Sequence, residues 1–252
     1  MKNLFLLIIV IFIIRPIVGS ASVDTLKDTS DVYDCIIYGY EGCVSELTGE
    51  NCKRYNGGNV VNLSVGNASV GLESRILFSF PGWDGTMPDS AIFEIYCYLE
   101  SDNYDRKIFL YPITKQIYEG TENGYNIGGY PNPDSGATWN HAWLDVGDSD
   151  SLNWSSSGGD YILTVACTTT ITNSSQYFRF NNFERILNYW DSSDNNYGII
   201  LINENAFPAN ASEKTIRSSE GPSSTIPLML MYFTDSVTVS RRRPIINFSK
   251  NK

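Results

Sequence analysis

Short runs of β-branched and aromatic residues recur along the chain, and clusters of Gly, Asn, Asp, Ser and Pro separate them. Such runs favour β-strands, and the clusters favour the turns between strands. The clearest run spans residues 91–100, in which apolar and more polar residues alternate, the apolar ones being Ala91, Phe93, Ile95, Cys97 and Leu99. A period of two residues predicts a strand with one buried face. No amphipathic stretch of a dozen residues predicts a long helix, so the expected fold class is all-β.

Other runs predict strands at residues 75–80, 108–113, 161–167, 199–202 and 227–232. The last two are almost entirely apolar, as in strands inside a sandwich, so we expect Leu230 to be buried. Residues 183–190 predict a short helix or turn that packs Ile186, Leu187 and Trp190 inward. No linker divides the chain and no internal repeat is visible. One jelly-roll-like antiparallel β-sandwich is therefore the expected architecture.

The first 22 residues have the pattern of an export signal. A positive residue, Lys2, precedes an unbroken apolar run from Leu4 to Ile14, and small residues follow. Cleavage is expected after Ser20, Ala21 or Ser22. A membrane anchor is the alternative, but these eleven apolar residues fall short of the roughly 20 that cross a bilayer. We therefore expect a secreted, extracellular or cell-surface protein that has no stable membrane span after cleavage.

The expected organisation has four parts. Residues 1–22 are the signal peptide, and residues 23–54 form a cysteine-containing segment that contributes a first strand. Residues 55–234 form the sandwich domain, and residues 235–252 form a basic tail. Loss of the signal removes Lys2 and Arg15, so the formal charge moves from −10 to −12. Such an acidic chain is not expected to bind nucleic acid.

The five cysteines all follow the signal, where disulfides can persist after export. Cys43 and Cys52 bracket a turn-rich stretch and form the preferred local disulfide. Cys97 and Cys167 either pair across the core or lie there as small apolar residues. Six Asn-x-Ser triplets are candidate glycosylation sites and are expected on exposed loops or strand ends: Asn62, Asn67, Asn153, Asn173, Asn210 and Asn247.

A series of motifs follows one order along most of the chain: Tyr55–Gly58, Leu63–Gly66, Arg75–Phe80, Ala91–Tyr96, Tyr118–Thr121, Gly136–Asn140, Trp154 with Gly158–Asp160, Trp190 with Asn196–Ile199, Arg217–Glu220 and Pro227–Tyr232. In this order the chain resembles the DNRLRE-type, disaggregatase-related β-sandwich domains, which are similar to carbohydrate-binding modules associated with polysaccharide lyases. The resemblance implies a jelly roll that binds glycans or plays a structural part in surface proteins, without catalysis. It also implies that Trp139, Trp154 and Trp190 fill the core. Residues 35–52 and the tail after Thr234 have no counterpart in the family.

Few residues are suited to catalysis. His141 is the one histidine, and no Gly-x-Ser-x-Gly motif is present to position a serine nucleophile. Paired carboxylates could cleave glycosidic bonds, but acidic residues are plentiful and no pair stands out. The protein is therefore expected not to be an enzyme, and a polysaccharide hydrolase or lyase is the least favoured of three functions.

The long irregular stretch from Tyr118 to Ser157 is the expected ligand surface, because a loop of that length in a compact domain is usually functional. Sugars stack on exposed aromatic rings while polar side chains reach their hydroxyls. The predicted ligand-binding residues on and beside this stretch are Tyr125, Asn126, Tyr130, Asn140, Trp143 and Asp160. No metal ligand is assigned, but calcium is the one cofactor considered, at Asp145–Asp150 or at Gly158–Asp160.

The first expected function is therefore the binding of a glycan or polysaccharide, and the alternative is a structural protein that assembles with copies of itself in an envelope or filament.

Removal of residues 1–22 should leave a soluble, β-rich protein, because the apolar run is a targeting segment and adds nothing to the core. Circular dichroism and gel filtration of the shortened chain test this. Aggregation of the shortened chain, together with an intact N-terminus in the secreted protein, would contradict it.

Overall fold

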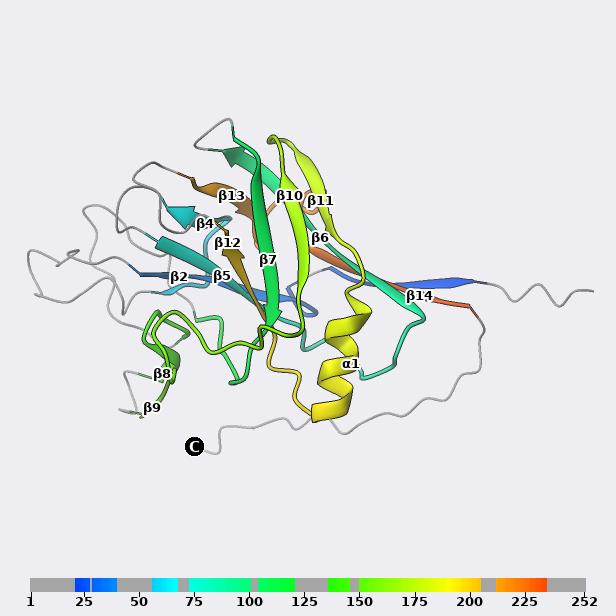
Figure 1. Ribbon diagram of the computed structural model, residues 1–252, viewed down its shortest axis with the longest axis horizontal. Helices are drawn as coiled ribbons and strands as arrows, with labels where there is room; N and C mark the ends of the chain where they lie inside the picture. Colours follow the sequence, from blue (N-terminus) through cyan, green and yellow to red (C-terminus); the bar gives the residue numbers. More distant parts are fainter. Residues whose placement is uncertain are drawn as a thin grey trace, which may run out of the picture.

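The computed structural model describes residues 21–27, 29–39, 56–67, 73–100, 104–120, 136–145, 150–204 and 212–234. It confirms the all-β fold, built from antiparallel strands with one helix in this part of the chain (Figure 1). Twelve of the described strands form one strongly curled sheet, which folds into the two faces of a sandwich. None of the described helices is long and apolar enough to cross a membrane.

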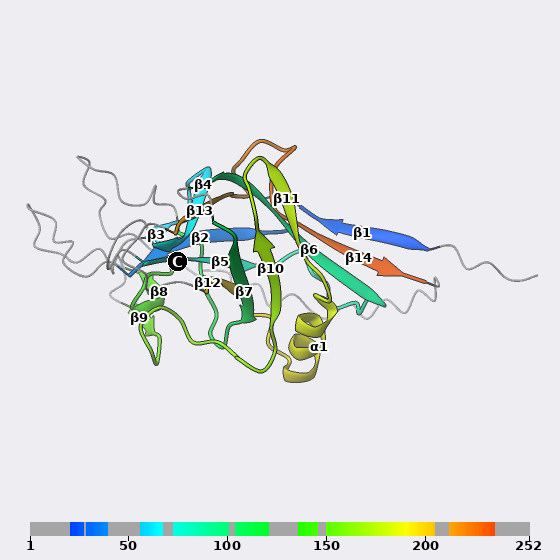
Figure 2. The same cartoon turned by 45° about the horizontal axis from the view of Figure 1, so that its top comes forward.

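We call the two faces of the sandwich sheet A and sheet B. Sheet A contains β1 (Ser22–Leu26), β4 (Asn62–Asn67), β6 (Ser90–Glu100), β11 (Gln176–Phe180), β13 (Lys214–Arg217) and β14 (Leu228–Phe233). The long strand β6 is its centre, because it pairs with β14 and β13 along one edge and with β11 along the other. β1 lies at the edge beside β14, and the two strands project together from the body (Figure 2).

Sheet B contains β2 (Tyr33–Tyr38), β3 (Asn56–Gly57), β5 (Glu73–Ser79), β7 (Arg106–Pro112), β10 (Cys167–Ile171) and β12 (Ile199–Asn203). The two sheets are joined by β4, whose first residues pair with β13 and whose last two pair with β5. β8 (His141–Asp145) and β9 (Asp150–Asn153) form a separate hairpin. α1 (Glu184–Ser193) lies at one end of the sandwich (Figure 1).

The main core lies between the two sheets and is rich in aromatic rings. Phe78 of sheet B meets Phe93 of sheet A edge to face, with their ring centroids 5.2 Å apart. α1 closes one end of this core with the predicted residues Ile186, Leu187 and Trp190, all buried. The predicted short helix is therefore confirmed, and its amphipathic face explains why it packs on the open end of the sandwich.

Sheet B carries a second core on its outer face. Successive residues of its strands point to opposite faces, so Ile36 lies in the main core while Cys35 and Ile37 lie in the second one. β12 divides its side chains in the same way. We call the residues that pack on this outer face the covering layer: 113–120, 136–145 and 150–163. Trp139 and Trp154 fill it and are buried, as expected.

Several details differ from the sequence-based predictions. Leu99 is 56% exposed, because the pairing of β6 with β13 slips in register and displaces the alternation. Residues 161–166 are not a strand. The regular pairing of β10 with β7 begins only at Cys167, the bridge between Tyr161 and Ile113 is isolated, and Leu163 is exposed. The segment 23–54 supplies most of β1 and all of β2, two strands where one was expected.

Leu230 is also not buried in the way that its apolar run predicts. It is half-buried, whereas its neighbours Met229 and Met231 are fully buried. The reason is that only one face of sheet A meets the core, whereas a continuous apolar run is typical of a strand covered on both faces.

The described cysteines are Cys35, Cys97 and Cys167, and all three are buried. Cys97 and Cys167 are free thiols. Cys97 and Cys167 therefore occupy the core as small apolar residues, the second of the two expected arrangements. Cys43 and Cys52 lie outside the described residues. Among the candidate glycosylation sites, Asn62, Asn153 and Asn173 are exposed, but Asn67 is 2% exposed. The expectation of exposure is wrong for Asn67, because it ends β4 at the junction of the two sheets. Asn210 and Asn247 lie outside the described residues.

Met229→Asp should unfold the protein, with a loss of about 3 kcal/mol or more, because it places an unpaired charge in the main core. Leu230→Asp is the matched control on the same strand and should cost clearly less, because its side chain reaches solvent. Urea denaturation followed by circular dichroism measures both. Equal losses for the two variants would contradict the assigned faces of β14.

Candidate functional site

An arginine anchors the covering layer to sheet B. The guanidinium of Arg75, on β5, lies 4.7 Å from the centroid of the Trp139 ring. Arg75 also donates to the Gly158 carbonyl over 2.7 Å and forms an ion pair with Glu73. A side chain at position 158 would meet the Trp139 ring at 2.8 Å, and Gly158 has a φ of +92°, so this position requires glycine. The geometry makes Trp139 a structural residue.

Trp154 and His141 hold the neighbouring turn. The Trp154 indole Nε1 donates to the Thr138 carbonyl over 2.9 Å. His141 begins β8, and its amide donates to the Thr138 hydroxyl over 3.1 Å, while its Nδ1 lies 3.0 Å from the same hydroxyl. His141 therefore contributes to the folding of this turn.

The carboxylate of Asp160 closes a second turn of the covering layer. It accepts the amides of Ser155 and Ser156 over 2.7 and 2.9 Å, and it pairs with Lys115 at 2.9 Å. Burial by itself would raise the pKa of Asp160, but the hydrogen bonds from Lys115 and the two amides outweigh it and lower the pKa to about 2. Because the amides and the ammonium occupy its oxygens, Asp160 holds the backbone together.

An open hollow of about 350 Å³ lies over this turn. Its lining is part polar and part apolar and consists of Arg75, Thr114, Ser156, Ser157, Gly159, Asp160, Tyr161 and Leu163. The predicted residue Asn140 borders the hollow through Ser157, whose hydroxyl donates to the Asn140 side chain over 3.2 Å. The Tyr161 ring stacks on Tyr111 of β7, with a centroid distance of 5.1 Å. The hollow thus combines hydroxyl groups, one cationic and one anionic side chain, one aromatic ring and the exposed Leu163.

The third described member of the predicted ligand set, Trp143, lies elsewhere on the covering layer. Its ring packs against Tyr118 with a centroid distance of 5.5 Å, and Tyr118 is 48% exposed. Neither ring is among the residues that line the hollow. Tyr125, Asn126 and Tyr130 lie outside the described residues. The structure therefore places Asp160 in the lining of the hollow and links Asn140 to it through Ser157, whereas Trp143 is not in the lining.

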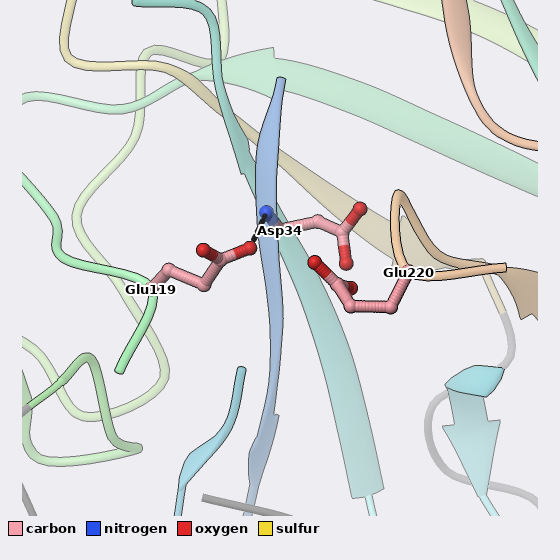
Figure 3. Close-up of side chains that lie close together, drawn as sticks. All are labelled: Asp34, Glu119 and Glu220. Atoms are coloured by element: carbon pink, nitrogen blue, oxygen red, sulfur yellow. Dashed lines mark hydrogen bonds between the residues drawn. The ribbon is translucent and has the colours of Figure 1, made fainter. Parts of the chain in front are cut away.

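Sequence reasoning missed a cluster of three carboxylates, Asp34, Glu119 and Glu220 (Figure 3). Asp34 belongs to β2, Glu119 to the covering layer, and Glu220 to the turn that follows β13. One oxygen from each residue can be chosen so that all three lie within 4.8 Å of one another. Asp34 and Glu119 are 85 positions apart in the chain. No local spacing could have revealed the cluster, although Glu119 and Glu220 each belong to a motif that resembles the family.

Hydrogen bonds hold each member of the cluster in place. The Asp34 amide donates to Glu119 Oε1 over 2.8 Å, and the Ser219 amide donates to Asp34 Oδ2 over 2.7 Å. The Ser219 hydroxyl donates to Glu220 Oε1 over 2.9 Å. A Cβ atom added at Gly58 would lie 2.1 Å from the Glu119 carbonyl oxygen. The backbone just after β3 therefore packs directly against the backbone at Glu119. The three side chains are thus positioned by the fold.

Electrostatics favour the protonated forms of two of these acids. Burial raises the pKa of Asp34 well above its ordinary value, and the charges of Glu220 and Glu119 raise it further against the Ser219 hydrogen bond. Burial, with a smaller effect of Glu220, raises the pKa of Glu119 to about 7. The fold therefore gathers three acidic groups at a place where water cannot fully solvate their charged forms.

Calcium was expected at Asp145–Asp150 or at Gly158–Asp160, and neither stretch belongs to the carboxylate cluster. The Asp160 carboxylate is already occupied by amides and by Lys115. Asp145 and Asp150 face each other in the β8–β9 hairpin, but their side chains lie outside the described residues.

Comparison with known proteins adds no family to this geometry. No family model matches the chain, and a search of curated proteins finds no significant match. The resemblance to DNRLRE-type domains thus depends on the motifs alone.

Asp160→Asn should lower stability by about 1 to 2 kcal/mol at pH 7, because it removes the charge that Lys115 and two amides stabilise. Since the pKa of Asp160 is lowered from 3.8 to about 2, this contribution is complete above pH 4 to 5 and is lost as the pH falls toward 2. Urea denaturation of both proteins between pH 3 and pH 7 measures the difference. If the difference in the free energy of unfolding between the two proteins stays constant over this pH range, the assigned role of Asp160 is contradicted.

Proposed function

We propose that this protein is a non-catalytic module, secreted or displayed at a cell surface, that binds carbohydrate through its covering layer. The observation that carries the proposal is the hollow over the Asp160 turn. A site of this size holds a small ligand, and a few oriented polar groups beside an aromatic ring suit a sugar, which offers hydroxyls and an apolar ring face.

Rigidity supports this proposal. The walls of the hollow are connected to sheet B through Arg75 and to the covering layer through the Asp160 turn. A preformed site loses little conformational entropy when a ligand binds. The exposed pair of Tyr118 and Trp143 adds a second aromatic surface on which a longer chain could stack.

The position of the clustered carboxylates supports a function in binding rather than in the cleavage of glycosidic bonds. Cleavage needs an acid and a second carboxylate that both touch the sugar. The three carboxylates that converge in the described residues include Asp34, which is only 1% exposed. None of the three lines the hollow. A net charge of −10 for the whole chain favours neutral over anionic polysaccharides.

The test uses two substitutions and a panel of immobilised cellulose, chitin, starch, dextran and alginate. Ser157→Trp fills the hollow from an exposed position and should weaken binding at least tenfold, about 1.4 kcal/mol. Tyr118→Ala removes an exposed ring and should cost about 1 kcal/mol of binding on long chains. Neither should change the melting temperature by more than about 3 °C, which corresponds to about 1 kcal/mol.

Two controls separate binding from folding. Tyr104→Ala removes a 70% exposed ring before β7, at the opposite end of that strand from Thr114, and should leave binding unchanged. Trp139→Ala removes a buried ring and should destabilise the protein by about 3 to 5 kcal/mol. Wild-type binding by Ser157→Trp, or no binding of any polysaccharide by the wild type, would refute the proposal.

Self-assembly is the second candidate function, and the position of β1 at the edge of sheet A favours it. This strand lies at the edge of sheet A, and three of its five residues are exposed, including Val23 at 54%. An uncovered edge strand can pair with another chain. If the protein binds no polysaccharide but sediments as concentration-dependent oligomers, and Val23→Lys abolishes them, this function replaces the first.

A further inference from the structure

Asp34 lies in the interior with one oxygen that has no hydrogen-bond partner. Its side chain is 1% exposed. Ser219 donates to Oδ2, but Oδ1 is buried without a partner in the described structure. A buried carboxylate without compensation is strongly unfavourable, so such a group calls for a partner. The Asp34 carboxylate extends from β2 toward Glu220 (Figure 3).

Glu220, like Asp34, has one oxygen that accepts a hydrogen bond and one that has no partner. Its Oε1 accepts the Ser219 hydroxyl, and its Oε2 is buried without a hydrogen-bond partner. The two unpartnered oxygens therefore belong to side chains that converge, and Glu119 completes the group. The hydrogen bonds hold one oxygen of each carboxylate, while Asp34 Oδ1 and Glu220 Oε2 have no partner in the described structure.

Neighbouring side chains do not supply the missing positive charge. In the described part of the chain, Arg75, Lys115, Arg179 and Lys214 form ion pairs with other acids. None of the described basic side chains pairs with Asp34, Glu119 or Glu220. Three acids thus share one small region without a basic partner from these segments.

We propose that Asp34, Glu119 and Glu220 bind one calcium ion. The oxygens lie within 4.8 Å of one another, and an ion with calcium–oxygen distances of about 2.4 Å can bridge oxygens up to about 4.8 Å apart. The set contains only carboxylate oxygens, which suit a hard cation rather than zinc or copper. Calcium accepts an irregular set of oxygen ligands, whereas magnesium demands a near-ideal octahedron at about 2.1 Å, so calcium is the proposed ion.

An ion here would join three segments that are distant in sequence. It would link β2 of sheet B to the covering layer through Glu119 and to the turn after β13 through Glu220. Calcium would also compete with the protons that the raised pKa values of Asp34 and Glu119 favour. The site is structural, and it does not depend on the carbohydrate proposal.

The experiment uses the full chain, freed of metal with EDTA and dialysed at pH 7.5. Isothermal titration with calcium chloride should show one ion bound per chain. Calcium at 100 times its Kd should raise the melting temperature by about 5 °C or more. EDTA should reverse the shift, and magnesium at the same concentration should produce less than half of it.

Three isosteric variants test the ligands. Asp34→Asn, Glu119→Gln and Glu220→Gln should each reduce calcium affinity at least tenfold. Without metal each should melt at or above the wild-type temperature, because it removes repulsion among the acids. Asp160→Asn is the matched control, since it removes an acid of the covering layer that Lys115 already neutralises. It should melt at a lower temperature and retain the full calcium shift.

Several results would overturn the proposal. The first is a wild-type protein that binds no calcium at 10 mM, which would mean that protons hold the cluster together. Unchanged affinity in both Asp34→Asn and Glu220→Gln would place the ion elsewhere. An equal response to magnesium would reject the assignment to calcium. If Asp34→Asn does not fold, Glu220→Gln, whose side chain is partly exposed, decides the test.

Discussion

Three strands of sheet B, β2, β5 and β12, are apolar on both faces, and much of the structure depends on that property. Alternate residues of β2, β5 and β12 enter two separate cores. The inner face is buried by sheet A, as in any sandwich. The outer face would expose a continuous apolar surface to water if nothing covered it, and burial of such surface is the main favourable contribution to folding. The chain between β7 and β10 must therefore return over this face.

This requirement changes how the long segment between β7 and β10 should be understood. Most of its described residues form a layer of the protein, pinned by Trp139, Trp154 and the stack on Arg75. A layer that is packed from below presents a fixed upper surface. The hollow beside Tyr161 and the pair of Tyr118 and Trp143 both lie on this layer. A rigid scaffold that carries polar groups and rings on its exposed side is the arrangement on which the carbohydrate proposal depends.

The carboxylate cluster lies where the covering layer meets both sheets. β2 contributes Asp34 from the sheet itself, whereas Glu119 and Glu220 come from connections that cross near it. Apolar burial alone would not place three acids together, because their mutual repulsion and their desolvation oppose folding. The hydrogen bonds from Ser219 and the Asp34 amide nevertheless hold them close. A bound cation would turn this unfavourable grouping into a link between the layers.

The amino-acid sequence by itself determined the all-β class, the strands β5, β6, β7, β12 and β14, and the short helix, because the period of the side chains and the turn residues are local signals. The resemblance in motifs implied that Trp139, Trp154 and Trp190 are buried, and they are. Local patterns failed where pairing decides the outcome: Leu99 is exposed by a slip in register, and Leu230 is half-buried because sheet A is covered on one face only. The tertiary structure alone decided which polar residues meet. Asp34 and Glu119 are 85 positions apart, and only the closure of the covering layer over sheet B brings them within reach of one ion, since contacts between distant segments leave no periodic trace in the chain.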